Sequence, residues 1–210
     1  MRLIIYNILF LLILFPSNFC FGQQSQGSWN LGFGITYPRF MSITRTSNSG
    51  DANYGGYLSL DRNFSEHISL RLKTGIYHIE SFYSIGNSFN TQRVTTFTGD
   101  VDFIYSLYPY EQVSPMFIVG GGFVGSRSQN SLNEALNKFI AGYEINFGLG
   151  AYWDISELWK LKTEINYHTV SNNKLDGNLS LTEPNKGILR SNGDTYMTFE
   201  IGVIWRINNG

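Results

Sequence analysis

The chain has only one cysteine, although disulfides stabilise many small exported domains, and it carries little charge. Its single cysteine, Cys20, excludes an internal disulfide and a cysteine-based metal cluster. Charged residues make up 15% of the sequence, and the net charge of −1 leaves no basic surface for nucleic acid. After Phe15 no apolar run reaches the roughly 18 residues of a transmembrane helix. We therefore expect no nucleic-acid partner, no cofactor and no metal site.

The first residues predict an export signal. A positive charge at Arg2 precedes the apolar run Leu3–Phe15, and Cys20–Gly22 places small residues at −3 and −1 for cleavage before Gln23. The alternatives are a buried N-terminal helix and a lipoprotein anchored through Cys20. Bulky Phe19 argues against lipoprotein processing. We expect residues 1–22 to be a signal peptide, so that the mature chain has no cysteine.

Aromatic residues (16%) and 22 glycines are abundant, and apolar residues alternate with polar ones along much of the chain. Such alternation is typical of strands, whose successive side chains point to opposite faces. It predicts eight strands: Ser28–Tyr37, Ala52–Asp61, His67–Ile79, Thr96–Tyr108, Pro115–Gly125, Lys138–Trp153, Lys160–Val170 and Thr195–Ile207. In the fifth strand glycines blur the pattern, and we expect Phe117, Val119 and Phe123 to point outward.

The connections between these strands alternate in length. Long connections span 38–51, 80–95, 126–137 and 171–194, whereas short ones span 62–66, 109–114 and 154–159. Outer-membrane barrels combine tight periplasmic turns with long extracellular loops. The prediction is an all-β, eight-stranded antiparallel up-and-down transmembrane β-barrel over residues 23–207, with a short periplasmic tail at 208–210. The alternative is a soluble periplasmic β-sandwich or a lipocalin-like carrier.

The aromatic residues predict where such a barrel would meet the two membrane surfaces. All four tryptophans fall where strands begin or end on the short-turn side: Trp29, Trp153, Trp159 and Trp205. Amphipathic rings favour headgroup depth, so we expect these four at the periplasmic rim. A belt at the opposite rim is expected from Tyr37, Phe82, Tyr83, Tyr167 and Tyr196.

The polar face of the predicted strands collects charges of both signs. These residues are Arg71, Lys73, Asp100, Asp102, Glu144, Lys162, Glu164 and Glu200. An eight-stranded barrel has an interior just wide enough for side chains, where an unpaired charge costs several kcal/mol. We expect a salt-bridged plug with glycines making room for it. The alternative is a proton or ion path through the same residues.

The C-terminal residues resemble the assembly signal of small eight-stranded outer-membrane barrels of the OmpA/OmpX-like family. That signal reads polar-x-Gly-x-x-aromatic-x-aromatic, and Glu200, Gly202, Trp205 and Ile207 occupy its positions, with Ile207 in place of the last aromatic. The signal-peptide end is similar to those of Bacteroidota. The resemblance implies a bacterial outer-membrane protein of structural, adhesive or surface-binding role, with no catalytic residues. Its implied partners are outer-membrane lipid and lipopolysaccharide and the barrel-assembly machinery, and we expect a monomer.

A second, local resemblance suggests an enzyme. Tyr167–Asn172 and Pro184–Ile188 look like the H-x-S-N and P-N-x-G-I motifs of the lipid A deacylase family (PagL), an outer-membrane barrel with a Ser-His-Glu triad. The resemblance would make Ser171 the nucleophile and His168 its base. Leu189 occupies the position of the family's Glu, so the orienting carboxylate of this alternative would be Glu183, outside the motif. Two residues separate His168 from Ser171, which in a strand places them on opposite faces. The lipid A ester hydrolase is therefore the alternative, and a non-enzymatic barrel is the main prediction.

Overall fold

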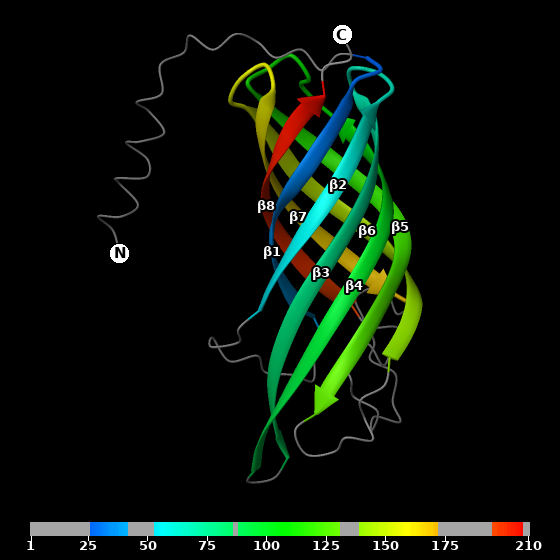
Figure 1. Ribbon diagram of the computed structural model, residues 1–210, viewed down its shortest axis with the longest axis vertical. Helices are drawn as coiled ribbons and strands as arrows, with labels where there is room; N and C mark the ends of the chain where they lie inside the picture. Colours follow the sequence, from blue (N-terminus) through cyan, green and yellow to red (C-terminus); the bar gives the residue numbers. More distant parts are fainter. Residues whose placement is uncertain (1–25, 42–52, 86–87, 131–138, 172–194, 208–210) are drawn as a thin grey trace, which may run out of the picture.

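The computed structural model describes residues 26–41, 53–85, 88–130, 139–171 and 195–207. Eight strands account for nearly all of them, and they close into one barrel in chain order (Figure 1). The strands are β1 (Trp29–Phe40), β2 (Tyr54–Asn63), β3 (Ile68–Ile85), β4 (Ser88–Ser106), β5 (Val113–Asn130), β6 (Phe139–Asp154), β7 (Trp159–Val170) and β8 (Thr195–Ile207). The predicted fold class is confirmed.

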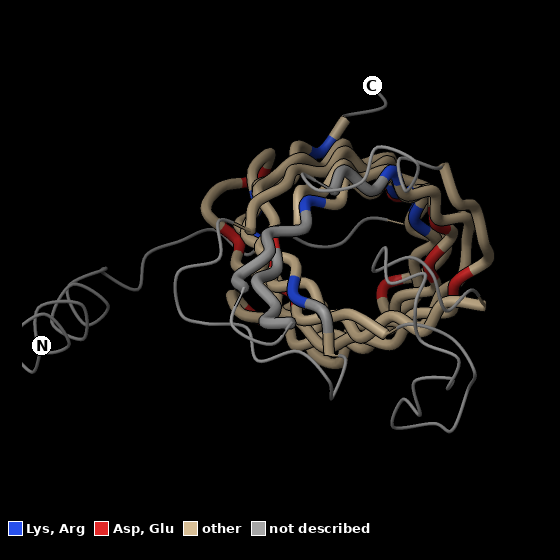
Figure 2. The backbone as a smooth tube through the Cα atoms, turned by 90° about the horizontal axis from the view of Figure 1, so that it is seen from below, with Lys and Arg blue, Asp and Glu red and all other residues tan. Residues whose placement is uncertain are grey.

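Every strand is antiparallel to its neighbours, and the barrel closes where β1 pairs with β8. This seam is a continuous ladder from Trp29 opposite Ile207 to Phe40 opposite Tyr196. Viewed along the axis, the eight strands form an unbroken ring (Figure 2). Closure satisfies the backbone groups that an open sheet leaves at its two edges.

The connections at one end of the barrel are short, as predicted. Residues 64–67, 107–112 and 155–158 join successive strands there, and the start of β1 and the end of β8 lie at this turn end. The opposite end, which we call the loop end, carries the connections 41–53 and 171–194. The predicted tail at 208–210 and most of these long connections lie outside the described residues.

One predicted long connection is wrong. Residues 80–95 were expected to form a loop, but β3 and β4 continue as a paired ribbon from Ile79 opposite Val94 to Ile85 opposite Ser88. The ribbon projects beyond the barrel at the loop end (Figure 1). The two strands of a paired ribbon satisfy each other's backbone hydrogen bonds, and this does not require an apolar face. The mostly polar sequence of this segment therefore did not show the alternation from which strands were predicted. β5 is also longer than predicted and reaches Asn130.

The fifth strand confirms the predicted orientation. Its ladder with β4 runs without a bulge through Gly120–Gly122, so the alternation keeps its phase. Phe117, Val119 and Phe123 are exposed on the outside, and Ile118 and Val124 are buried inside.

The barrel is apolar outside and polar inside, the reverse of a soluble protein. The exposed large apolar side chains form a belt around all eight strands; examples are Ile35, Leu58, Leu72, Val101, Phe117, Leu149, Ile165 and Ile201. The buried side chains are predominantly polar or charged. No helix in the described part of the chain is long and apolar enough to cross a membrane.

Candidate functional site

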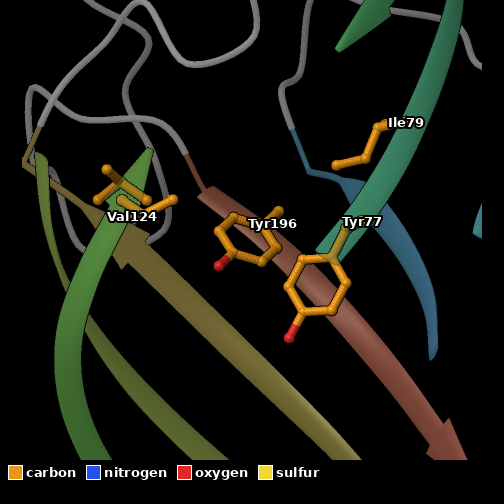
Figure 3. Close-up of a cluster of buried hydrophobic side chains, with 5 residues drawn as sticks. Tyr77, Ile79, Val124 and Tyr196 are labelled. Carbon is orange, nitrogen blue, oxygen red and sulfur yellow. The ribbon is translucent and has the colours of Figure 1, made fainter. Parts of the chain in front are cut away.

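The interior of the barrel, or lumen, is filled in three layers. An apolar cluster at the loop end consists of Tyr77, Ile79, Val124, Val170 and Tyr196, whose labelled members converge from several strands in Figure 3. A second apolar cluster at the turn end consists of Ile104, Met116, Ile118, Tyr152 and Ile204. Between them lie most of the buried charged side chains, so both ends of this ionic layer are covered by packed apolar groups, whereas Asp154 and Lys160 pair at the turn end.

Arg71 on β3 organises the part of the ionic layer nearest the turn end. Its Nη1 donates to Glu164 Oε1 at 2.6 Å, and its Nε donates to Asp61 Oδ1 at 3.2 Å. Its Nη2 donates to the Tyr152 hydroxyl at 2.9 Å. The side chain is fully buried, so one guanidinium fork links β2, β6 and β7 across the barrel.

Two lysines occupy the middle of the lumen. Lys73 Nζ lies 2.9 Å from Glu200 Oε1, and Lys162 Nζ lies 3.2 Å from Glu164 Oε2 and 3.9 Å from Glu200 Oε2. Lys162 Nζ also lies 4.1 Å from the centre of the Tyr57 ring, which is a cation–π contact. Each ammonium therefore has an opposite charge inside the barrel.

A histidine and a carboxyl group meet at the loop-end side of the ionic layer. The Tyr196 hydroxyl donates to Glu144 Oε2 at 2.5 Å, and His168 Nδ1 lies 3.3 Å from the same oxygen. The His168 ring stacks on Tyr196 with centroids 4.3 Å apart, and its Nε2 lies 3.2 Å from Thr198 Oγ1. The imidazole thus has a polar group beside each of its two nitrogens and an aromatic ring stacked on its face.

Inward-facing glycines provide the space for these side chains. Gly34 on β1 and Gly202 on β8 are opposite each other, and a Cβ on either would collide with the Tyr57 hydroxyl. A Cβ on Gly148 would likewise collide with Asn166, and one on Gly120 with Asp102. Large polar side chains thus lie over glycines of neighbouring strands, as the sequence analysis predicted in general terms.

All eight charged residues predicted for the lumen are buried inside the barrel. The predicted set lacks Asp61, which ended its predicted strand, and the hydroxyl groups of Tyr57, Tyr77 and Tyr152. Tyr196 was expected in an outer belt, and this was wrong because Tyr196 is fully buried. In each case the signal was available, since these residues share the parity of the inward-facing residues on their strands.

The four predicted rim tryptophans all lie at the turn end. Trp159 and Trp205 are opposite each other on β7 and β8, with ring centroids 6.3 Å apart. The Arg62 guanidinium lies 5.0 Å from the centre of the Trp29 ring, and Trp153 is exposed at the end of β6. Their depth in a membrane stays a prediction.

The predicted assembly signal lies within β8. Glu200 and Gly202 point into the lumen, whereas Trp205 is exposed and Ile207 is opposite Trp29 at the seam. Glu200 and Gly202 therefore have structural roles in this barrel, in addition to any recognition by assembly machinery.

The residues of the alternative esterase do not come together. His168 is fully buried in the lumen, whereas Ser171 is exposed and its Oγ accepts a hydrogen bond from the Tyr143 backbone N–H at 3.0 Å. The two residues point to opposite sides of the barrel wall, and a general base must be within hydrogen-bonding reach of its nucleophile. Glu183 lies outside the described residues.

Within the described ranges, no group of three or more His, Cys, Asp or Glu side chains has the arrangement of a metal site. The lumen is thus a set of ion pairs and hydrogen bonds between protein side chains. Such a set can fill and rigidify a barrel, and it can hold protons.

Comparisons with known proteins identify the fold. No family model matches the chain, and no curated protein matches it by sequence. Among solved structures it is similar to OprG from Pseudomonas aeruginosa, with 10% identity and a TM-score of 0.62 over 90% of this chain and all of that one. It is also similar to Neisserial surface protein A (11%, TM-score 0.57, 87% of this chain and all of that one) and to Ail, the attachment invasion locus protein of Yersinia pestis (10%, TM-score 0.53, 87% and all). The fold is that of small outer-membrane β-barrels, as predicted.

Proposed function

We propose that this chain is a non-enzymatic protein of the bacterial outer membrane, exported by its N-terminal signal. In this proposal its lumen is closed, and its long loops serve surface structure or binding. The observation that carries it is the combination of an apolar belt around the barrel with ion pairs inside. A soluble barrel would expose the belt to water at a cost of about 25 cal/mol per Å² of apolar surface, whereas a lipid bilayer covers it.

The closed lumen is supported by its packing. Apolar clusters cover both ends of the ionic layer, and Arg71 and Lys162 have no exposed side-chain surface. Eight-stranded barrels have interiors that side chains can fill, whereas water-filled channels are found in barrels with many more strands. Transport through the lumen would require these ion pairs to separate.

Fractionation and solute release test this proposal together. We expect the mature protein in the outer-membrane fraction, with a gel mobility that changes on boiling, as a folded barrel unfolds. Purified protein in liposomes is expected to release no more trapped small dye than empty liposomes, with a known porin as the positive control. A periplasmic protein without a mobility shift would contradict membrane residence, and dye release would contradict a closed lumen.

A charge in the apolar belt is expected to destabilise the barrel in lipid. Leu149 is exposed in the middle of β6, at a level consistent with the centre of a bilayer, so Leu149→Arg should cost about 2 to 4 kcal/mol. Urea unfolding in liposomes, followed by tryptophan fluorescence, measures this loss. Ile155→Arg is the matched control, because Ile155 is equally apolar and exposed but lies in the turn 155–158. Equal effects of both variants would mean that the belt does not contact lipid.

The ester hydrolase is not favoured, because His168 and Ser171 lie on opposite sides of the wall. The surface role falls to the loop end, where the long connections between the strands lie.

A further inference from the structure

The buried charges of the lumen do not balance. Among the described residues, seven Asp and Glu and four Lys and Arg are buried, and Asp154 and Lys160 pair with each other near the turn end. The remaining acids are Asp61, Asp100, Asp102, Glu144, Glu164 and Glu200, and the remaining bases are Arg71, Lys73 and Lys162. If all were ionised, the lumen would therefore carry three excess negative charges, less any charge on His168.

Only three of these six acids have a cationic side chain close by. Asp61, Glu164 and Glu200 each lie within 3.2 Å of a cationic nitrogen. Asp102 is 4.0 Å from Arg71 Nη1 and accepts a hydrogen bond from Asn146 Nδ2 at 3.0 Å. The excess negative charge would therefore lie mainly on Asp100 and Glu144. An ionised carboxylate without a partner in a dry interior is so costly that it normally takes up a proton instead.

The backbone places Asp100 and Glu144 in one row of the barrel. Asp100 on β4 is opposite Gly122 on β5, and Gly122 is opposite Glu144 on β6. Because the residue between them is glycine, no side chain separates the two carboxyl groups, and they interact directly. A Cβ at Gly122 would lie 2.5 Å from Asp100 Oδ1, so a side chain there would occupy the space of this contact.

A hydrogen bond between two carboxyl groups requires a proton on one of them. Neither oxygen of Asp100 nor Glu144 Oε1 has another hydrogen-bond partner in the described part of the chain. Glu144 Oε2 already accepts from Tyr196 and faces His168, which leaves Oε1 for Asp100. Two like charges at this separation repel, so one carboxyl keeps its proton while the other ionises.

The other groups facing this pair do not replace the proton. From β3 come Lys73, which donates to Glu200 at 2.9 Å, and Tyr77. From β7 comes His168, whose Nδ1 faces the other Glu144 oxygen, and from β8 come Tyr196 and Glu200. Asp102 lies two residues along β4 and adds negative charge. The described residues also lack the arrangement of a metal site, and a proton is the cation that two facing carboxyl groups share.

We propose that Asp100 and Glu144 form a proton-binding site that holds one proton between them in the closed lumen. The folded barrel then binds a proton that the two separate carboxyl groups of the unfolded chain release at neutral pH. Stability therefore falls with rising pH from the range in which the carboxyl groups of the unfolded chain ionise, and the fall ends once the folded site has also lost its proton. The site does not depend on the proposed surface role or on membrane residence.

Asp100→Asn tests the site because its amide donates permanently where the carboxylic acid donates only when protonated. We expect the urea midpoint of the wild-type barrel in detergent micelles to fall from weakly acidic to alkaline pH, and the fall to be lost or much reduced in Asp100→Asn. Infrared spectroscopy at neutral pH should show the C=O stretch of a protonated carboxylic acid in the wild type and its loss in the variant. Glu144→Gln serves as a second variant if Asp100→Asn does not fold.

Asp61→Asn is the matched control, because Asp61 is an equally buried acid but is paired with Arg71. It should lower the midpoint at every pH while keeping both the pH-dependent fall and the infrared band. Absence of the band in the wild type at neutral pH would overturn the proposal, as would a pH-dependent fall unchanged in both Asp100→Asn and Glu144→Gln. A midpoint raised by Ca²⁺ in the wild type but not in Asp100→Asn would also overturn it, in favour of a cation site.

Discussion

Replacing Arg71 with methionine is expected to destabilise the barrel by about 3 to 5 kcal/mol, or to prevent folding altogether, because it leaves buried charges unpaired. Methionine keeps most of the aliphatic volume but removes the donors to Glu164, Asp61 and Tyr152. The measurement is urea unfolding in detergent micelles, followed by heat-modifiable gel mobility. A loss this large would be a substantial part of the total stability of a small domain.

Two further variants show whether the loss of stability comes from leaving buried charges unpaired or from removing an arginine as such. Arg93→Met removes a mostly exposed arginine from its ion pair with Glu80, and we expect no measurable change in the urea midpoint. The triple variant Arg71→Met, Asp61→Asn, Glu164→Gln removes the acids as well, and it should recover much of the lost stability. Equal midpoints for Arg71→Met and wild type would show that the ion pairs contribute little to the closed lumen.

The second large effect is expected at the seam of the barrel. Gly202→Ala adds a Cβ that would collide with the Tyr57 hydroxyl and lie 2.5 Å from the Phe33 carbonyl oxygen. The side chain of Tyr57 can move, but the backbone of β1 is held by the β1–β8 ladder. Overpacking of this kind typically costs 1 to 3 kcal/mol, and we expect about 2 kcal/mol from the urea midpoint.

Gly99→Ala is the control for this variant. Gly99 also lies within a strand, but it faces outward and an added Cβ there would meet no atom within 4 Å. It should leave stability nearly unchanged, or raise it slightly by restricting the unfolded chain. If both alanine variants behaved alike, the effect at position 202 would reflect glycine in a strand rather than contact with Tyr57.

The alternation of side chains made most of the fold predictable. A period of two assigns each residue to a face, and eight such segments with alternating connections leave few arrangements besides an up-and-down barrel. The same rule placed Glu144, Lys162 and Glu200 inside. It failed for Tyr196 because the prediction relied on its aromatic side chain instead of on its position two residues before Thr198, which faces inward.

The partners within the lumen could not be derived in the same way. Parity tells that Arg71 and Glu164 both point inward, but not that they meet across the barrel at 2.6 Å. That depends on the stagger of the strands, which is set by the register of all eight ladders together. The Asp100–Glu144 contact likewise required the pairing of Gly122 with both residues.

The seam between β1 and β8 makes barrel formation a late event in folding. Trp29 and Ile207 are nearly as far apart in the sequence as two of the described residues can be, yet they are opposite each other in the ladder. Contacts of such long sequence separation carry the largest loop-closure cost and slow folding. Until β8 arrives, the first seven strands have two open edges that can pair with other chains. Protection from aggregation is therefore needed throughout synthesis and export, up to the moment when the last strand pairs with the first.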